Sequence, residues 1–293
     1  MKRRIKVLLI TIAVIAGILT VAYIVIYAVS TYRLNKVYTF EEESLIIPSD
    51  SASLRAGQHI ARIRWCEDCH GKDFGGRVLK SSPEFGVIAG PNLTTGTGGI
   101  GGRLKDEDYV RAIRHGVDRD HRTLLIMPAN VYSDLSDTDV QNLVAYLKSL
   151  SPVNRNIPET TPGPMLLMLY AFGQFPALAP AALIEDHNAP VSNVDATVVS
   201  IANGKYQISI CAGCHGNTLK GKDSQVPGGK HASDLTLTGH PGRWTEEQFI
   251  HVLRTGETPE GKQLDPKDMP WTITANFTDE EIRSIYQYLH TLQ

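Results

Sequence analysis

The chain opens with an uninterrupted apolar segment. From Val7 to Val29 there are 23 residues without a charged side chain, dominated by Val, Ile, Leu and Ala. A helix of that length rises about 34 Å, which is enough to cross a bilayer core of about 30 Å. The pattern therefore predicts a transmembrane anchor at residues 1–30, followed by a polar stalk at residues 31–50.

The charges around this segment predict its orientation. Four basic side chains precede it, at positions 2, 3, 4 and 6, and such residues stay on the cytoplasmic side of a membrane. Everything beyond Ser30 is then expected on the opposite side, after a single crossing. A cleaved signal peptide is the alternative, because Ala28-Val29-Ser30 has a small-x-small pattern. The apolar run, however, exceeds the roughly 7–15 residues of a signal-peptide core.

Beyond residue 50 the apolar positions recur at helical spacing, and strand-like alternation is almost absent. N-cap residues such as Ser136 and Thr278 precede acidic first turns, and Gly116 and Gly256 follow predicted helix ends. The pattern indicates an all-α fold. The expected helices are at 53–65, 105–115, 136–150, 197–211, 245–255 and 278–292.

These helices belong to an internal repeat of about 95 residues. The matched segments begin at Gly57 and Gly204, Gly71 and Gly216, Asn92 and Asp234, Gly102 and Gly242, Met127 and Met269, and Tyr146 and Tyr288. The repeat predicts two tandem domains at residues 51–151 and 197–293. Between them lies a linker at residues 152–196, which holds seven of the chain's 16 prolines.

The linker contains a second apolar stretch, from Met165 to Leu183. Gly173, Pro176 and Pro180 interrupt it, so it is too broken to predict a second membrane span. We expect this stretch to pack over both domains or to contact a partner subunit.

The formal charge of −2 hides an asymmetry, because no acidic residue precedes residue 31. Residues 31–293 carry 25 of the 29 basic side chains and all 31 acidic ones, a formal charge of −6. A part of the chain with this charge and no basic stripe excludes nucleic acid as an expected partner. It is compatible with a partner that presents a positive docking patch.

All four cysteines occur in one motif. They form Cys66-Glu-Asp-Cys69-His70 and Cys211-Ala-Gly-Cys214-His215, and Cys-x-x-Cys-His is the attachment signature of c-type haem. Two thiols one helical turn apart can bond to the two vinyl groups of one porphyrin. The histidine, four residues after the first cysteine, lies on the same helical face and can reach the iron. The sequence thus predicts two covalently bound haem c groups.

Other uses of paired cysteines fit this sequence less well. A thioredoxin-like dithiol needs a βαβ pattern, which neither pair has. The pairs of a four-cysteine zinc site usually lie about 15–20 residues apart, whereas 141 residues separate Cys69 from Cys211. Disulfides give no reason for a histidine directly after each pair.

Haem iron needs a second axial ligand, and two methionines occupy matching places for that role. Met127 lies 57 residues after His70 and Met269 lies 54 after His215, both within Met-Pro. Histidine with methionine fills the coordination sphere and raises the reduction potential, which suits electron transfer. Met165 and Met168 of the linker are interpreted as apolar packing.

Two pairs of arginines also match between the halves. Arg103 and Arg243 form one pair, and Arg114 and Arg254 the other. Either pair can bind haem propionates or simply carry a solvated charge at a helix end. The remaining histidines, such as His59, His115 and His231, occupy no matching positions and are weaker ligand candidates.

Both halves resemble class I cytochrome c domains on these motifs: Cys-x-x-Cys-His, Asn/Asp-Leu-Thr, Met-Pro and a last helix with Tyr-Leu. The resemblance covers about residues 53–150 and 200–293. The chain looks like the membrane-anchored dihaem cytochromes of bacterial respiratory chains. It is also similar to cytochrome subunits of periplasmic alcohol dehydrogenases, which carry three haem motifs where this chain has two.

The resemblance implies one-electron transfer on the periplasmic face of the inner membrane. The expected partners are a quinol-oxidising complex, a dehydrogenase or a terminal oxidase, and no catalysis by the chain itself is expected. It also implies that Cys66, Cys69, His70 and Met127 hold one haem, and Cys211, Cys214, His215 and Met269 the other. A dihaem enzyme of the peroxidase or thiosulfate-oxidising type is the alternative, and it requires an open or differently ligated iron.

Overall fold

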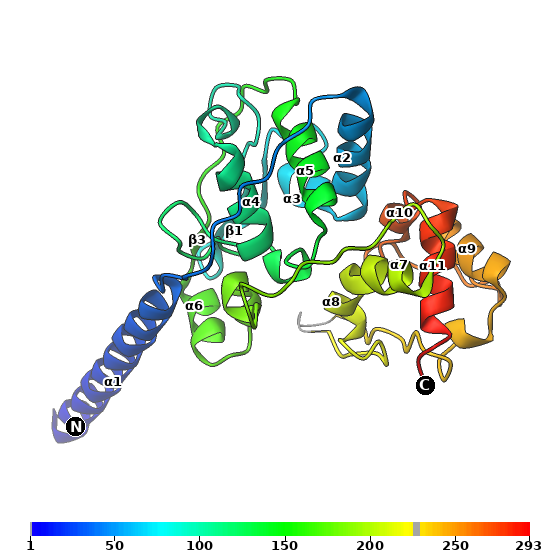
Figure 1. Ribbon diagram of the computed structural model, residues 1–293. Helices are drawn as coiled ribbons and strands as arrows, with labels where there is room; N and C mark the ends of the chain where they lie inside the picture. Colours follow the sequence, from blue (N-terminus) through cyan, green and yellow to red (C-terminus); the bar gives the residue numbers. More distant parts are fainter. Residues whose placement is uncertain (1, 225–228) are drawn as a thin grey trace.

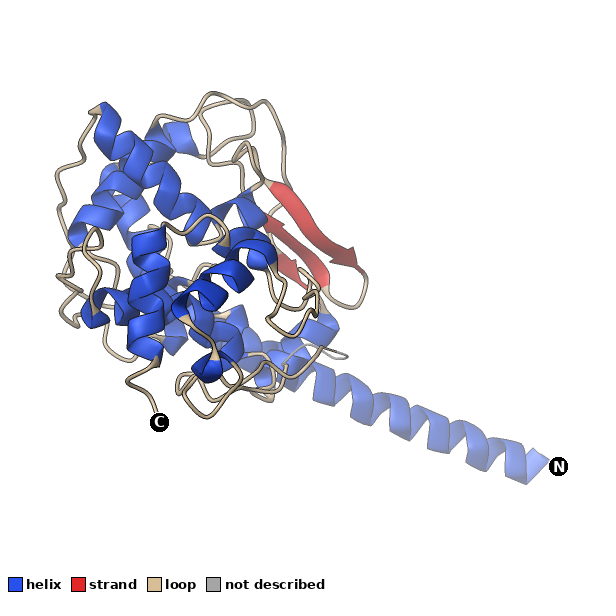
Figure 2. Ribbon diagram, turned by 90° about the vertical axis from the view of Figure 1, so that its right-hand side faces the viewer, coloured by secondary structure: helices blue, strands red, loops and turns tan. Residues whose placement is uncertain are grey.

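The computed structural model describes residues 2–224 and 229–293. Figure 1 shows one long helix that projects from two mostly helical domains, the first drawn in blue to green and the second in yellow to red. The mostly helical fold and the tandem arrangement agree with the sequence prediction. Figure 2 shows the one sheet of the described residues beside the first domain's helices.

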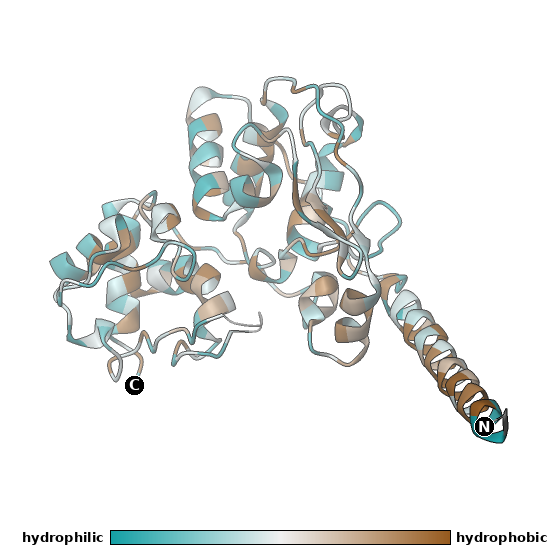
Figure 3. Cartoon of the chain, turned by 180° about the vertical axis from the view of Figure 1, so that it is seen from behind, coloured by the Kyte–Doolittle hydropathy of each residue, from teal (hydrophilic) through white to brown (hydrophobic). Residues whose placement is uncertain are grey.

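The projecting helix is α1 (Lys2–Leu34). Its side chains from Ile5 to Val25 point away from the rest of the protein, and Figure 3 shows that its surface is predominantly apolar. Among the described residues, it is the one helix long and apolar enough to cross a membrane by length and composition. The structure therefore extends the predicted apolar helix by one turn beyond residue 30.

The last turns of α1 are joined to the folded part by α6 (Pro164–Ala171). The Ser30 hydroxyl is completely buried and donates a hydrogen bond to the carbonyl of Leu167 at 3.1 Å. The guanidinium of Arg33 donates to the carbonyl of Ala171, also at 3.1 Å. The apolar stretch of the linker thus contacts the C-terminal end of the apolar helix α1.

Residues 35–50 lie along the first domain and do not form a free stalk. Tyr38 is buried, and its amide donates to the carbonyl of His121 at 2.9 Å. Glu42 pairs with Arg111 at 3.1 Å, and Glu43 pairs with Arg114. Because apolar Leu45 and Ile47 also pack on the first domain's core, this segment is a strap that fixes α1 to the domain.

The first domain contains four helices and a small sheet. The helices are α2 (Ser51–Ile63), α3 (Cys66–His70), α4 (Asp106–His115) and α5 (Asp137–Lys148). The sheet consists of β1 (Arg77–Ser82) and β2 (Gly86–Gly90) of the domain and β3 (Thr161–Pro162) of the linker, antiparallel in that order. The sequence pattern does not predict this sheet, because β1 is almost entirely solvent-exposed and shows no alternation between apolar and polar residues.

The second domain repeats the helices, and its described residues, 197–224 and 229–293, form no sheet. Its helices are α7 (Ile201–Gln207), α8 (Ala212–His215), α9 (Glu246–Thr255), α10 (Trp271–Thr274) and α11 (Asp279–Leu289). Thr278 and Glu281 form the predicted capping box at the start of α11. Short 3₁₀ turns at η1 (Gly101–Arg103) and η6 (Pro241–Arg243) precede the middle helix of each domain.

Each domain is built around a close crossing of its first and last helices. A Cβ atom added to Gly57 of α2 would lie 1.9 Å from the carbonyl oxygen of Asn142 in α5. A Cβ atom added to Gly204 of α7 would lie 1.9 Å from the carbonyl oxygen of Ser284 in α11. The matched glycines of the repeat are therefore the points where two helix backbones touch.

We expect Gly57→Ala to destabilise the first domain by about 3 kcal/mol, because the added methyl group must push two helices apart. Thermal or chemical denaturation followed by circular dichroism measures the change. Gly102→Ala is the matched control, since its Cβ would meet nothing closer than Thr95 at 4.0 Å. Equal unfolding midpoints for the two variants would show that the crossing can relax at little cost.

The linker packs mainly on the first domain. Leu166, Leu167 and Tyr170 of α6 are buried with Leu178 and Ala179, and Phe85, Ile88, Leu125 and Ile126 of the first domain surround them. Val194 and Ala196 pack on that domain's main core. The apolar stretch therefore covers one domain and the end of α1, which differs from the expected wrapping of both domains.

Candidate haem-binding sites

Each Cys-x-x-Cys-His motif is wound into a short helix directly after the first helix of its domain. Trp65 precedes α3 in a left-handed conformation, with φ of 64°, and this bend ends α2 before the motif begins. Cys66, Cys69 and His70 then lie at positions i, i+3 and i+4 of one helical turn. Cys211, Cys214 and His215 have the same spacing around α8.

The two motif histidines are held in the same way. His70 Nδ1 lies 3.0 Å from the carbonyl oxygen of Pro91, and His215 Nδ1 lies 2.7 Å from that of Ser233. A carbonyl only accepts hydrogen bonds, so Nδ1 carries the proton and Nε2 of the neutral ring keeps its lone pair. Burial lowers the pKa of both histidines, which favours that neutral form. Each ring is therefore prepared to bind a metal ion through Nε2.

The turn after each motif is also the same. Phe74 and Leu219 both have positive φ, 53° and 58°, four residues after the motif histidine. Their carbonyls accept hydrogen bonds from the amides of Leu93 and Leu235, at 2.9 and 2.8 Å. This turn fixes the Asn/Asp-Leu-Thr segment beside the motif, which places the carbonyls of Pro91 and Ser233 against the histidines. A backbone acceptor carries no side-chain signal, so the sequence does not reveal this role.

The first cysteine of each motif, Cys66 or Cys211, is a half-buried thiol. No disulfide joins the four cysteines, and burial raises the pKa of Cys66 and of Cys211 to about 12. Within residues 2–224 and 229–293, no three His, Cys, Asp or Glu side chains converge on a point that could hold a metal ion. A four-cysteine zinc site is therefore not formed by the described residues.

In the second domain the motif and its methionine line one apolar cavity. Cys211 and His215 contribute to its wall together with Met269. The rest of the lining is Ile208, Leu235, Phe249, Leu253, Thr274, Phe277, Ile285 and Leu289. An apolar cavity with two thiol-bearing positions nearby, an imidazole and a thioether is the set of groups that a His/Met-ligated haem c requires.

In the first domain the corresponding first cysteine and methionine pack on the hydrophobic core. Cys66 and Met127 both pack against the cluster formed by α2, α4 and α5. The buried indole Nε1 of Trp65 has no hydrogen-bond acceptor among the described residues. An unpartnered donor beside the attachment motif suits a ligand that brings its own acceptors, such as the propionates of haem. The residues of both domains thus fit the group.

The arginine pairs differ in what they contact. Arg103 and Arg243 end η1 and η6, where both side chains are exposed. Arg114 and Arg254 are instead bound to the start of the last helix in their own domain. Their matched partners are the carbonyl of Leu135 and the carboxylate of Asp137, and the carbonyl of Phe277 and the carboxylate of Asp279. These contacts favour a structural role for Arg114 and Arg254 over propionate binding.

His59 and His115, two of the remaining histidines, contact segments far away in the sequence. His59 Nε2 lies 2.9 Å from the carboxylate of Glu281, at the boundary between the domains. His115 is buried beneath Phe40, with ring centroids 3.8 Å apart, and its Nδ1 lies 3.2 Å from Nδ1 of His187 in the linker. Neither arrangement has a counterpart among the described residues of the other half of the chain.

The His115 site gives the fold a defined acid sensitivity. Burial lowers the pKa of His115 to about 4, helped by repulsion from His187 and Arg114. Between pH 6.5 and about 4 the unfolded chain therefore binds a proton that the folded chain does not, so stability falls as pH falls through this window. The native protein should therefore lose stability between pH 7 and pH 4.5. We expect this loss to be smaller by about 2 kcal/mol in His115→Gln.

Denaturation at a series of pH values measures this change as a shallower slope of stability against pH. His251→Gln is the control, because the side chain of His251 is 54% exposed. If the stability of the His115 variant depended on pH as steeply as that of the native protein, other groups would account for the acid sensitivity.

Comparison with known proteins places these features in a family. The family model described as "Cytochrome C oxidase, cbb3-type, subunit III" matches twice, over residues 52–147 and 200–289. These two matches contain both motifs and Met127, Met269, Arg103 and Arg243.

The matches to curated relatives cover 82% to 83% of the chain. The cytochrome c subunit of a quinone-dependent alcohol dehydrogenase from Gluconacetobacter polyoxogenes is 27% identical. The gluconate 2-dehydrogenase cytochrome c subunit from Pantoea cypripedii is also 27% identical, and the fructose dehydrogenase cytochrome subunit from Gluconobacter japonicus is 26% identical. The matched regions cover 57%, 60% and 52% of these relatives, so the chain spans less than two thirds of their length.

Proposed function

Since the chain belongs to the cytochrome c family of cbb3-type cytochrome c oxidase subunit III, we propose that it is a dihaem, membrane-anchored electron-transfer subunit. Its role is to pass single electrons between a respiratory complex or dehydrogenase and a terminal acceptor. The relatives named as cytochrome subunits of dehydrogenases support a dehydrogenase as the donor. They also support a carrier rather than a catalyst.

One observation carries this proposal: the same set of groups is built twice, with the same contacts. Each half has a thiol pair, a histidine whose Nδ1 donates to a backbone carbonyl and a Met-Pro at the matching place. A single occurrence of a methionine near an apolar cavity is often simple packing. The repetition of the whole set supports two closed His/Met sites.

The residues have distinct roles in holding the groups. Cys66 and Cys69 would attach one haem and Cys211 and Cys214 the other, while His70, Met127, His215 and Met269 would bind iron. When bound, haem c supplies reversible one-electron chemistry at iron. The carbonyls of Pro91 and Ser233 keep each histidine in the required tautomer and orientation. Exposed Arg103 and Arg243 are proposed to reach propionates at the protein surface.

The contacts at the end of α1 support a retained anchor. Ser30, part of the small-x-small pattern, is completely buried against Leu167, and the helix continues to Leu34 without a break. Cleavage after Ser30 would remove a residue that the folded domain contacts. We therefore propose a single uncleaved span with its basic N-terminus in the cytoplasm and both haem domains in the periplasm.

Purified full-length protein tests the proposal directly. We expect two haem c groups per chain by pyridine haemochrome assay, a methionine-to-iron charge-transfer band in the oxidised spectrum, and no reaction with carbon monoxide after reduction. Rapid carbon monoxide binding or turnover of peroxide or thiosulfate would support the enzyme alternative instead. Purification from native membranes in mild detergent would identify a fixed partner, because such a partner co-purifies in stoichiometric amount.

A further inference from the structure

Arg64 is a buried cation that lies between the two haem-attachment motifs. It follows α2 and precedes Cys66 by two residues, and it is 1% exposed. Its Nη2 donates to Oε1 of Gln207 at 3.0 Å, and its Nη1 donates to Oγ of Ser209 at 3.3 Å. Gln207 and Ser209 belong to the second domain and precede Cys211 by four and two residues. One guanidinium thus connects the starts of both motifs.

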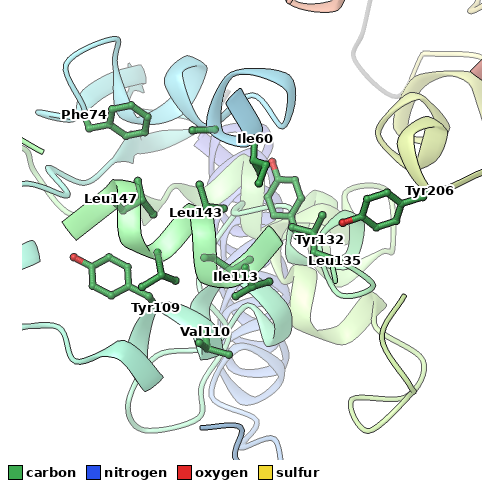
Figure 4. Packing of buried hydrophobic residues seen from close by; sticks show 13 residues of the cluster. Ile60, Phe74, Tyr109, Val110, Ile113, Tyr132, Leu135, Leu143, Leu147 and Tyr206 are labelled. Atoms are coloured by element: carbon green, nitrogen blue, oxygen red, sulfur yellow. The ribbon is translucent and has the colours of Figure 1, made fainter. Parts of the chain in front are cut away.

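The contacts around Arg64 fix the two domains to each other. The hydroxyl of Tyr132 donates to the carbonyl of Arg64 at 2.6 Å, and the guanidinium lies 5.3 Å from the ring centroid of Tyr206. Figure 4 shows Tyr206, from the second domain, with its hydroxyl directed toward Tyr132 and Leu135 of the first. That hydroxyl accepts from the amide of Ser136 at 3.1 Å and donates to Asp139 at 2.5 Å. Arg64 is therefore held in one place by both domains.

The charge of Arg64 has little direct compensation. Its acceptors in the second domain are neutral, its Nε has no hydrogen-bond partner, and no carboxylate forms an ion pair with it among residues 2–224 and 229–293. Burial raises the pKa of the nearby Asp134 and Asp139, and the charge of Arg64 opposes that rise without forming an ion pair with either carboxylate. Burying a guanidinium without an ion pair carries a desolvation cost, and its charge is poorly screened by solvent there.

We propose that Arg64 is a positioning residue shared by both haem sites, whose buried positive charge raises the reduction potential of each haem. The inference rests on the proposed two-haem function. Oxidised iron carries one more positive charge than reduced iron, and a fixed cation in a region of low dielectric disfavours the oxidised form. The charge also acts on both Cys66 and Cys211, where it opposes the rise in thiol pKa that burial causes.

The test is a spectroelectrochemical titration of full-length Arg64→Met, Arg64→Lys and Arg62→Met proteins. We expect Arg64→Met to lower both potentials, with an approximately fivefold change in each reduction equilibrium, or about 40 mV for a one-electron couple. Arg64→Lys should keep most of the native values because it keeps the charge. Arg62 is the matched control: it lies two residues before Arg64, is 47% exposed and contacts Glu67, so its loss should change neither reduction equilibrium by more than about twofold.

A second variant protects the test against misfolding. Ser209→Asp keeps Arg64 but places a carboxylate beside the guanidinium at a partly buried position, and it should lower both potentials without removing the interface. A shift of one haem alone, no shift in either, or a lysine variant that behaves like methionine would overturn the proposal. A native protein with fewer than two haems would instead contradict the proposed function, because the inference presupposes both.

Discussion

A Cys66→Ala, Cys69→Ala variant is expected to retain one haem per chain where the native protein holds two. Without either thiol the first domain cannot bond covalently to a porphyrin, while Cys211 and Cys214 still can. The two helix crossings, at Gly57 and Gly204, belong to separate domains, so the second domain retains its own core. Haem content per chain, measured by pyridine haemochrome and intact mass, should fall by half.

The complementary variant, Cys211→Ala with Cys214→Ala, should lose the other haem and keep the first. His251→Gln serves as the control, because the side chain of His251 is 54% exposed and lies 3.6 Å from Glu257, so its loss should leave two haems. If either cysteine variant kept both haems, covalent attachment by the two motifs would be refuted. Loss of both haems from one variant would show that the domains mature as a unit.

Replacement of the proposed axial methionines should change the potentials strongly and separately. We expect Met127→His and Met269→His each to lower the potential of one haem by on the order of 100 mV, because imidazole stabilises oxidised iron more than a thioether does. The charge-transfer band of the altered haem should disappear. Redox titration with optical spectra resolves the two haems and measures both effects.

Met165→His is the matched control, since Met165 lies in α6, outside both sites. It should leave both potentials and both spectra unchanged. An unaltered spectrum in either the Met127 or the Met269 variant would mean that another residue binds that iron. The second domain is the sharper case, because Met269 lines the same cavity as Cys211 and His215.

The helical frame of both domains could be predicted because its signals are local. Acidic first turns, N-cap residues and terminal glycines set the observed limits of α4 (Asp106–His115) and α9 (Glu246–Thr255) to within one residue of the expected ones. Because of the internal repeat, the same helix start and end signals occur in both halves and support each other. A thiol pair followed by histidine is similarly explicit, since one chemical requirement fixes its spacing.

The remaining features depend on contacts between distant segments. The exposed strand β1 gains its structure from pairing with β2, and nothing in Arg77-Val-Leu-Lys-Ser-Ser82 shows a buried face. Arg64 has no basic counterpart in the second half, where Ser209 occupies the matching position, so the repeat gives no reason to select it. Its role emerges only when the second domain is placed against the first. Similarly, the sequence does not indicate that α6 contacts the end of α1.

The union of α1 with α6 and the strap at residues 35–50 leaves no slack between span and domain. With α1 in the bilayer, the first domain has no flexible tether that would let it move away from the membrane. It can then only diffuse laterally and rotate together with α1 in the plane of the membrane. Encounters with a partner then become a two-dimensional search at nearly fixed height. A partner embedded in the same membrane can therefore approach this protein in only a few relative orientations, whereas a soluble partner must bind close to the membrane surface.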